Sequence, residues 1–297
     1  MLTRIFKKAG FVIQRNFYNV QIRNLLSGIV KIFLPIGSRN EGIEYLNINR
    51  TENEIADDLK QYGFSNLGLV ISNDKITSIF EKLSKLKSYD TNRSGHPIVD
   101  LNNPDDETQL AHYTRTDLSN FEEVLMIAND SKILNVVTSY FGAKPTISNI
   151  NCWWSFSGRQ SAKEAQFFHR DMDDYKFLKM FIYLTDVTED SGPHIYVKGS
   201  HKSNKLAQLK RFSDQEVIDQ YGDEEILTLV YPKGYGFIED TYGIHKGQLP
   251  SNGRRLLLQI QYSYLPLFVE KYEPVKSNNV ERMGLDPYIN RLIVQQK

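Results

Sequence analysis

The stretch Gln166-Phe167-Phe168-His169-Arg170-Asp171 decides the fold of this chain. Alternate residues of an extended segment point to the same side, so His169 and Asp171 can meet at one metal ion. A second imidazole, His245, follows 76 residues later in Asp240-Thr241-Tyr242-Gly243-Ile244-His245-Lys246-Gly247. Two imidazoles and one carboxylate are the ligand set of a facial non-haem iron site.

Short strand-like runs separated by turns surround this stretch. We expect eight of them, over residues 146–156, 166–171, 176–187, 194–198, 226–231, 236–239, 243–247 and 255–265. One helix is expected among them, over residues 213–221. This spacing favours a mainly β fold with flanking helices, a double-stranded β-helix of the jelly-roll or cupin-like kind.

Helices are expected before the strands. One begins after Thr51, with Glu54 closing a capping box, and ends at Gly63. A short strand over 67–71, a helix over 74–86 and a long loop over 88–108 follow. Residues 119–141 are predicted to form a helix in two pieces, with Ser119 and Glu122 as a second capping box.

The organisation that follows has three parts and one catalytic domain, because no flexible linker interrupts the chain. Residues 1–50 form a basic, apolar-rich N-terminal segment, residues 51–271 the β-helix domain with its helical N-terminal part, and residues 272–297 a C-terminal extension. The 297 residues, of which 40% are hydrophobic, suffice for one sizeable core.

Charge and cysteine content exclude several classes of protein. The 36 basic and 36 acidic side chains give a net charge of zero, so no whole-molecule field favours nucleic acid. Cys152 is the only cysteine, which excludes an internal disulfide and a thiolate zinc site. A reducing, cytoplasmic location fits best.

The N-terminal segment departs from this balance. Residues 1–40 contain seven bases and no acid, which leaves the remainder of the chain with a net charge of −7. Such a segment can pack on the barrel, dock on an acidic partner or lie on an anionic membrane surface. Its apolar runs are too short or too interrupted for a signal peptide or a membrane span, whereas a transit peptide stays open.

Four motifs, taken in order, carry a resemblance to a known family. They are the stretch 166–171, Phe181-Ile182-Tyr183-Leu184-Thr185-Asp186-Val187, Ser191-Gly192-Pro193 and Gly199-Ser200-His201-Lys202. With His245 and the paired arginines, the chain resembles the phytanoyl-CoA dioxygenase family of iron(II)/2-oxoglutarate oxygenases over about residues 145–265, and more weakly back to Glu54. The resemblance implies that His169, Asp171 and His245 hold iron(II), with 2-oxoglutarate and O2 as cosubstrates.

The resemblance also implies an arginine for the distal carboxylate of 2-oxoglutarate, about seven residues before an aromatic on the strand after the second histidine. Arg255 has that relation to Tyr262, so it is preferred to Arg254. Many relatives place a second anchor, a hydroxyl residue, where this chain has Gly247. Another donor is then required, and the candidates are Gln166, Asn151 and Tyr183.

Other residues near the motif are expected to have different roles. Asp173 and Asp174 are rivals of Asp171, but they lie four and five residues after His169, where a same-face relation along a strand is lost or uncertain, and they are interpreted as a solvated turn. His194 is expected either to line the cavity or to lie on the surface.

The leading hypothesis is an oxygenase that hydroxylates a small metabolite. A non-catalytic jelly-roll protein that docks through its basic N-terminus and a cupin-like metal isomerase are the alternatives. The substrate and the oligomeric state are not specified by these patterns.

Overall fold

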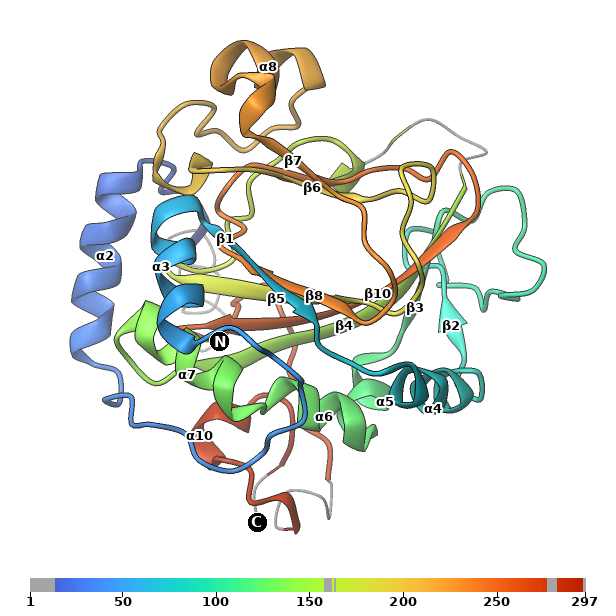
Figure 1. Ribbon diagram of the computed structural model, residues 1–297, viewed down its shortest axis with the longest axis horizontal. Helices are drawn as coiled ribbons and strands as arrows, with labels where there is room; N and C mark the ends of the chain where they lie inside the picture. Colours follow the sequence, from blue (N-terminus) through green and yellow to red (C-terminus); the bar gives the residue numbers. More distant parts are fainter. Residues whose placement is uncertain (1–13, 158–161, 163, 277–281, 296–297) are drawn as a thin grey trace.

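Two antiparallel sheets face each other across the interior of the molecule (Figure 1). The computed structural model describes residues 14–157, 162, 164–276 and 282–295. The larger sheet has the strand order β1-β8-β5-β10-β4-β3-β2, and the smaller has β7-β6-β9. This is the predicted jelly roll.

The bounds of the strands agree with most of the predicted runs. Larger-sheet strands are β1 (Phe64–Leu69), β2 (Ser88–Tyr89), β3 (Leu110–Tyr113), β4 (Thr146–Phe156), β5 (Phe177–Tyr183), β8 (Tyr235–Glu239) and β10 (Arg254–Ser263). Smaller-sheet strands are β6 (His194–Val197), β7 (Ile226–Leu229) and β9 (His245–Gly247).

Two predictions about strands were wrong. Residues 166–171 belong to neither sheet: a 3-10 helix, η1 (Glu164–Gln166), is followed by isolated bridges of Phe168 to Phe212 and His169 to His245. Strands β2 and β3 were missed, because they lie at or just beyond the ends of the predicted loop and each spans only a few residues.

Helices cover the outer face of the larger sheet and the ends of the barrel (Figure 1). They are α2 (Val20–Ile32), α3 (Glu52–Tyr62), α4 (Asn73–Leu83), α5 (Arg115–Asn120), α6 (Glu122–Ala128), α7 (Ser131–Phe141), α8 (Asp214–Tyr221) and α10 (Pro287–Asn290), with the 3-10 helices η2 (Ser200–Lys202) and η3 (Asp223–Glu225).

Capping explains where the helices begin. The predicted box of Thr51 and Glu54 is confirmed, and Gly63 ends α3 in the left-handed conformation that glycine adopts without strain. The predicted box at Ser119 was wrong, because Ser119 is buried within α5, and α6 begins at Glu122 after Phe121, which provides no side-chain cap. Asp130 instead caps α7, accepting hydrogen bonds from backbone amides of its first turn.

Alternation along β5 and β10 sorts side chains between the two faces of the larger sheet. Met180 and Leu256 join the core cluster that packs under the helices, whereas Phe181 and Leu257 belong to the cluster between the sheets. Lys179 lies two residues before Phe181, and Arg255 lies two residues before Leu257. Both charged side chains therefore point into the barrel as well. The parity of a strand position therefore decides which side chains can reach a site there.

Both ends of the described chain pack on this body. In the N-terminal segment, Arg23 of α2 is buried, and Ile48 belongs to the main core. In the C-terminal extension, Val275 bridges to Val294, and Ile289 is fully buried. The three-part division stays a prediction. No helix in the described part of the chain is long and apolar enough to cross a bilayer.

Candidate metal centre

A pair of backbone hydrogen bonds sets the two candidate histidines side by side. The amide of His169 donates to the carbonyl of His245, and the amide of His245 donates back, both at 3.0 Å. Two residues on, the amide of Asp171 donates to Thr241 at 2.9 Å. The imidazole centroids are consequently only 4.3 Å apart.

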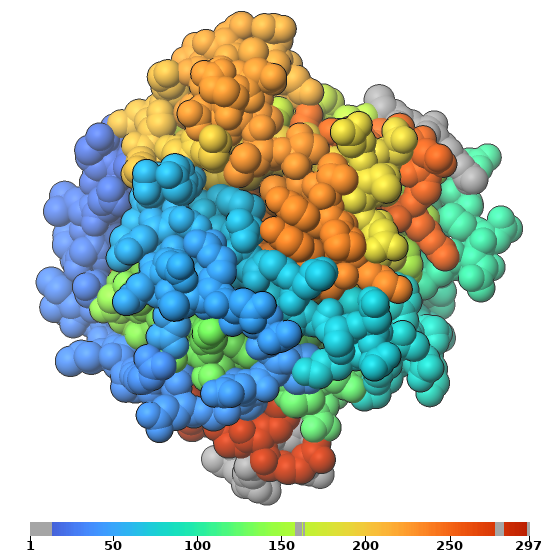
Figure 2. All heavy atoms as spheres, viewed as in Figure 1, coloured from blue at the N-terminus to red at the C-terminus, as the bar shows by residue number. Residues whose placement is uncertain are grey.

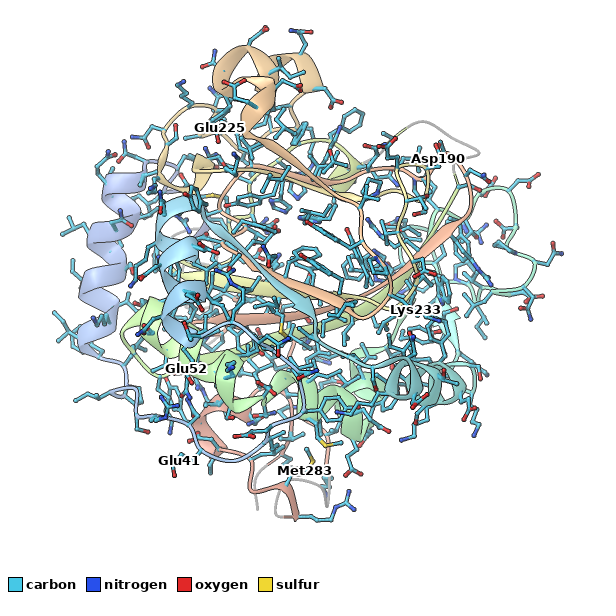
Figure 3. The ribbon with its side chains drawn as sticks, in the orientation of Figure 1. Glu41, Glu52, Asp190, Glu225, Lys233 and Met283 are labelled. Carbon is cyan, nitrogen blue, oxygen red and sulfur yellow. The ribbon has the colours of Figure 1, made fainter. Side chains whose placement is uncertain are left out.

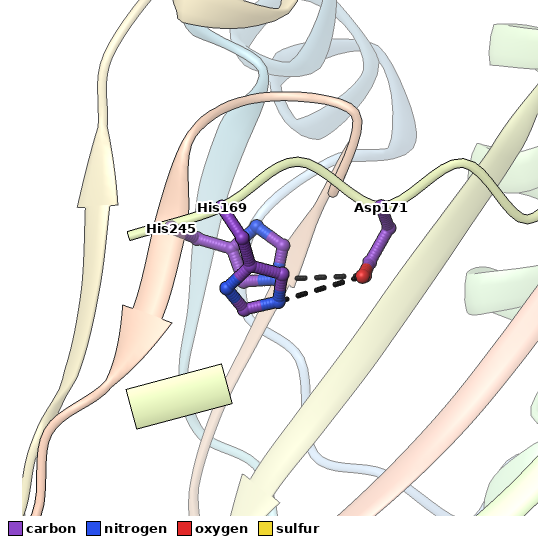
Figure 4. Close-up of side chains that lie close together, drawn as sticks. All are labelled: His169, Asp171 and His245. Atoms are coloured by element: carbon purple, nitrogen blue, oxygen red, sulfur yellow. Dashed lines mark ion pairs between the residues drawn. The ribbon is translucent and has the colours of Figure 1, made fainter. Parts of the chain in front are cut away.

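The three side chains converge at one point (Figure 4). One potential ligand atom from each of His169, Asp171 and His245 lies within 4.8 Å of the others. Nε2 of His169 is 3.5 Å from Oδ1 of Asp171, and Nε2 of His245 is 3.4 Å from Oδ2. Two nitrogens and one carboxylate at this separation suit a divalent metal ion.

Backbone carbonyls fix the tautomers of both imidazoles. Nδ1 of His169 lies 2.9 Å from the carbonyl oxygen of Phe167, and Nδ1 of His245 lies 3.0 Å from that of Gly243. A carbonyl only accepts, so each Nδ1 carries a proton, and in the neutral ring the Nε2 that faces Asp171 is the atom with the lone pair. This is the arrangement in which a histidine binds a metal.

Lys179, which sequence reasoning missed, lies against the carboxylate. Its Nζ donates to Oδ2 of Asp171 at 2.6 Å and is 3.0 Å from Oδ2 of Asp173. Burial would raise the pKa of Asp171, but the Lys179 cation and the two histidines outweigh it and hold that pKa well below its usual range. Asp171 is therefore an anion, as a metal ligand must be.

These residues line one cavity of about 180 Å³, the barrel cavity. Its wall also includes Gln166, His194 and Arg255. Arg255 is 3% exposed, whereas Arg254 is exposed, stacks over Trp154 and donates to the carbonyl of Leu101. Successive residues of a strand face opposite sides, so only one of the two arginines can enter the barrel.

Arg255 is a buried cation without an ion-pair partner among the described residues. Its Nη1 donates to the carbonyl of Gly192, and its Nη2 lies 3.4 Å from Oγ of Ser155. Its Nε is buried with no hydrogen-bond partner. Because an unpaired buried guanidinium is costly, this corner of the cavity suits a carboxylate ligand.

Comparison with known proteins identifies the family of the chain. A model of the phytanoyl-CoA dioxygenase family matches residues 59–249. The chain belongs to this family. The predicted resemblance is thus confirmed. No curated protein sequence matches the chain.

Solved structures share the fold. The non-haem alpha-ketoglutarate-dependent carbocyclase SnoK from nogalamycin biosynthesis is 16% identical, with a TM-score of 0.53 over 72% of this chain and 85% of that chain. HygX from Streptomyces hygroscopicus, with nickel and 2-oxoglutarate bound, is 17% identical, with a TM-score of 0.52 over 75% and 90%. EctD from S. alaskensis in its apoform is 13% identical, with a TM-score of 0.51 over 75% and 81%.

This family member departs from the pattern at Gly247, and the structure shows what occupies the space. A Cβ at position 247 would lie 3.3 Å from Nη2 of Arg255. The missing side chain thus leaves room for the guanidinium. On the other side, Ser155 of β4 is the register partner of Arg255 and brings a hydroxyl to the same corner.

The predicted substitutes for the missing hydroxyl lie in different places. Gln166 lines the barrel cavity, while Asn151 and Tyr183 are not among its lining residues. The hydroxyl of Tyr183 instead donates to the carbonyl of Leu229 and accepts from the amide of His194. Ser155 was missed because the pairing of β4 with β10 is not visible in local spacing.

A buried acid and imidazole lie behind the metal centre. Nε2 of His194 is 2.9 Å from Oε1 of Glu239, and the ring of His194 stacks on His245 with centroids 5.6 Å apart. Burial raises the pKa of Glu239 to about 8 and lowers that of His194 well below its usual range. The contact is therefore a hydrogen bond from a neutral carboxylic acid to a neutral imidazole.

Three predictions about other side chains can now be settled. His194 is in the cavity wall. The solvated-turn interpretation was wrong for Asp174, which is fully buried, accepts from the amides of Tyr175 and Leu265, and has a pKa raised by burial to about 6. Asp173 is partly buried and pairs with Lys179. Neither belongs to the group of converging ligand atoms.

Lys179 and Glu239 carried a signal in the sequence. Lys179 interrupts the apolar run Phe177-Leu178-Lys179-Met180-Phe181, and Glu239 ends the run Gly236-Phe237-Ile238-Glu239. A charged residue at the inward parity of a buried strand points into the barrel, where it needs a partner. The two positions are register partners on β5 and β8.

Proposed function

We propose that this protein is a non-haem iron(II)/2-oxoglutarate-dependent oxygenase that hydroxylates a small molecule and converts 2-oxoglutarate to succinate and carbon dioxide. One observation carries the proposal. Two imidazoles with free Nε2 atoms and one anionic carboxylate converge in the same cavity as a buried guanidinium that has no ion-pair partner among the described residues. Family membership supports the same cofactors.

Each residue has a role that follows from its surroundings. His169, Asp171 and His245 would hold iron(II) through Nε2, a carboxylate oxygen and Nε2. Arg255 would pair with the distal carboxylate of 2-oxoglutarate, with the Ser155 hydroxyl beside it. When bound, iron(II) and 2-oxoglutarate activate O2 to oxidise a C–H bond of the substrate.

Proteins with the same fold support 2-oxoglutarate as the cosubstrate and a small molecule as the substrate. HygX crystallises with nickel and 2-oxoglutarate, and in another crystal with hygromycin B as well. SnoK is a carbocyclase, so the same fold serves reactions other than hydroxylation. The retained carboxylate of Asp171 argues against the halogenases of this class, in which a small residue admits chloride.

The first experiment is an anaerobic titration with iron(II) and 2-oxoglutarate, followed through the visible charge-transfer band of the chelate. We expect a band in the wild type, none in His245→Ala, and a band in Arg255→Gln that needs at least about tenfold more 2-oxoglutarate. Ser155→Ala should weaken 2-oxoglutarate binding by a few-fold.

Arg254→Gln is the matched control, because it removes the neighbouring guanidinium from the outer side of the same strand. Its titration should equal that of the wild type. A folded wild type without a band would refute the proposal and favour the non-catalytic binding protein. Metal binding without 2-oxoglutarate binding would favour the metal isomerase.

Hydroxylation itself is tested on the product. With candidate small molecules, iron(II), 2-oxoglutarate and 18O2, the product should gain one labelled oxygen atom for each succinate formed. Loss of two hydrogens without gain of oxygen would show cyclisation or desaturation instead.

A further inference from the structure

Helix α2 is turned with its apolar side toward solvent. Six large apolar side chains in residues 22–36 are between 44% and 91% exposed, although only thirteen are exposed in the whole described chain. They form what we call the apolar α2 face: Ile22, Leu25, Ile29, Ile32, Phe33 and Ile36. Figure 1 shows α2 at one edge of the molecule with one side against the body, and its side chains project outward in Figure 3.

Polar contacts hold the helix in this orientation. Arg23, on the inner side, is 3% exposed, donates to the carbonyl of Asp174 and lies 4.2 Å from the ring centroid of Tyr242. At the start of the helix, the side chain of Asn204 accepts from the amide of Val20 at 2.8 Å. The inner side also buries Val20 and packs Val30 on the core, but most of the large apolar side chains face outward, so the usual arrangement of a surface helix, apolar inside and polar outside, is largely reversed.

The surroundings of the apolar α2 face are basic. Residues 14–40 contain Arg15, Arg23, Lys31 and Arg39 but no acid, although Arg23 is buried and Arg39 pairs with Glu52. Lys202 and Lys60, the latter also 3.0 Å from Oδ1 of Asp57, border the helix across a cleft of about 420 Å³ that is lined by Gln21 and Asn24 as well. Both lysines are exposed. Figure 2 shows that α2 forms the outer surface on this side.

We propose that the apolar α2 face and its basic border dock on an anionic lipid bilayer surface. The helix would lie in the interface with its apolar side chains inserted and the lysines paired with lipid headgroups. A second copy of the chain fits less well, because a symmetric contact through α2 would bring two acid-free segments together. None of these side chains lines the barrel cavity, so this inference is independent of the proposed function.

Vesicle sedimentation with the full chain tests the proposal. We expect at least about tenfold tighter binding to phosphatidylcholine vesicles that contain phosphatidylserine than to phosphatidylcholine alone. The triple variant Leu25→Ser, Ile29→Ser, Phe33→Ser should lose about tenfold or more of that binding. All three positions are exposed, so the variant should fold.

The matched control replaces equally exposed apolar residues elsewhere: Leu69→Ser, Leu209→Ser, Val269→Ser. It should bind vesicles as the wild type does. Wild-type protein that does not bind anionic vesicles, binds neutral ones equally well, or binds unchanged in the triple variant would overturn the proposal. So would a wild-type dimer in light scattering that the triple variant converts to a monomer.

A fluorescent reporter follows insertion directly. Phe33 is 81% exposed, so Phe33→Trp should emit as a solvated indole in free protein and shift to shorter wavelength with anionic vesicles. The emission of Trp153 and Trp154 is removed by subtracting the wild-type spectrum. A short-wavelength difference spectrum before vesicles are added would mean that another part of the chain covers this face, which would also overturn the proposal.

Discussion

The barrel cavity buries charged side chains, whereas the apolar α2 face exposes apolar ones. Each region therefore departs from the usual partition of side chains, and in opposite directions. In the cavity, Lys179 and Asp171 compensate each other, while Arg255 has no ion-pair partner among the described side chains. On α2 the contacts of Arg23 and Asn204 lie on the inner side of the helix. The apolar side chains on its outer side are not covered by any described residue.

This difference separates two kinds of functional region. Buried charge is tolerated only where geometry supplies a counter-charge or a ligand does so later. Exposed apolar surface costs the folded chain little, and its benefit comes only when a partner covers it. Substitutions in the cavity should therefore change ligand binding and stability together, and substitutions on α2 should change neither in the isolated protein.

The largest effect should follow from Asp171→Asn. This change keeps the shape of the side chain and removes the anionic ligand, so iron(II) affinity should fall by more than about 100-fold, measured by competition with a chelating dye. Asp173→Asn is the control, because Asp173 also pairs with Lys179 but lies outside the converging group. Equal losses in the two variants would contradict the assignment of Asp171 as the ligand.

Lys179→Met should have the next largest effect. Without the cation beside it, the pKa of Asp171 rises, so the acid limb of metal binding should move to higher pH. Affinity near neutral pH should drop by about 10- to 100-fold. Lys176→Met, which removes a lysine outside the cavity, should leave both quantities unchanged. An unshifted acid limb in Lys179→Met would show that the cation does not tune the carboxylate.

Glu239→Gln should change the pH dependence of stability. Burial raises the pKa of Glu239 to about 8, so between its unfolded pKa and this value the unfolded chain releases a proton that the folded chain keeps. The wild type therefore loses stability as pH rises through this window, and the glutamine variant does not.

Urea unfolding of the metal-free protein at pH 5 and pH 8 measures this effect. We expect the stability of the variant relative to the wild type to rise by about 3 to 4 kcal/mol over that range. The exposed Glu189→Gln change should show no such trend. Parallel curves for Glu239→Gln and the wild type would mean that Glu239 is already ionised in the folded protein.

The smallest effect should come from Leu25→Ser together with Ile29→Ser. Because both side chains are about half exposed or more, the free energy of unfolding should change by less than about 0.5 kcal/mol for each substitution. The iron(II) and 2-oxoglutarate band should be unchanged. A loss of more than about 2 kcal/mol in urea unfolding would show that the isolated protein buries this face.

Local patterns in the sequence were enough for the mainly β fold, the first capping box and most strands. Strands β4 and β10 were predictable because apolar and aromatic residues recur between polar ones along each run, with no glycine or proline to interrupt it. The prediction of a strand over 166–171 was wrong because the backbone there pairs with other segments only through isolated β-bridges, at Phe168 and at His169. The reversed orientation of α2 could not be predicted, since it depends on Arg23 finding the carbonyl of Asp174, 151 residues away.

The sequence by itself determined which residue types are available and on which side of a strand each lies. Alternation along an extended backbone, together with the family resemblance, singled out His169, Asp171 and His245. The resemblance also favoured Arg255 over Arg254, through the spacing of Arg255 from Tyr262. Only the tertiary structure decided their partners. Register between strands and the crossing of segments far apart in the chain brought Lys179 to Asp171, Ser155 to Arg255 and His194 to Glu239. These contacts depend on long-range packing, which local spacing does not encode.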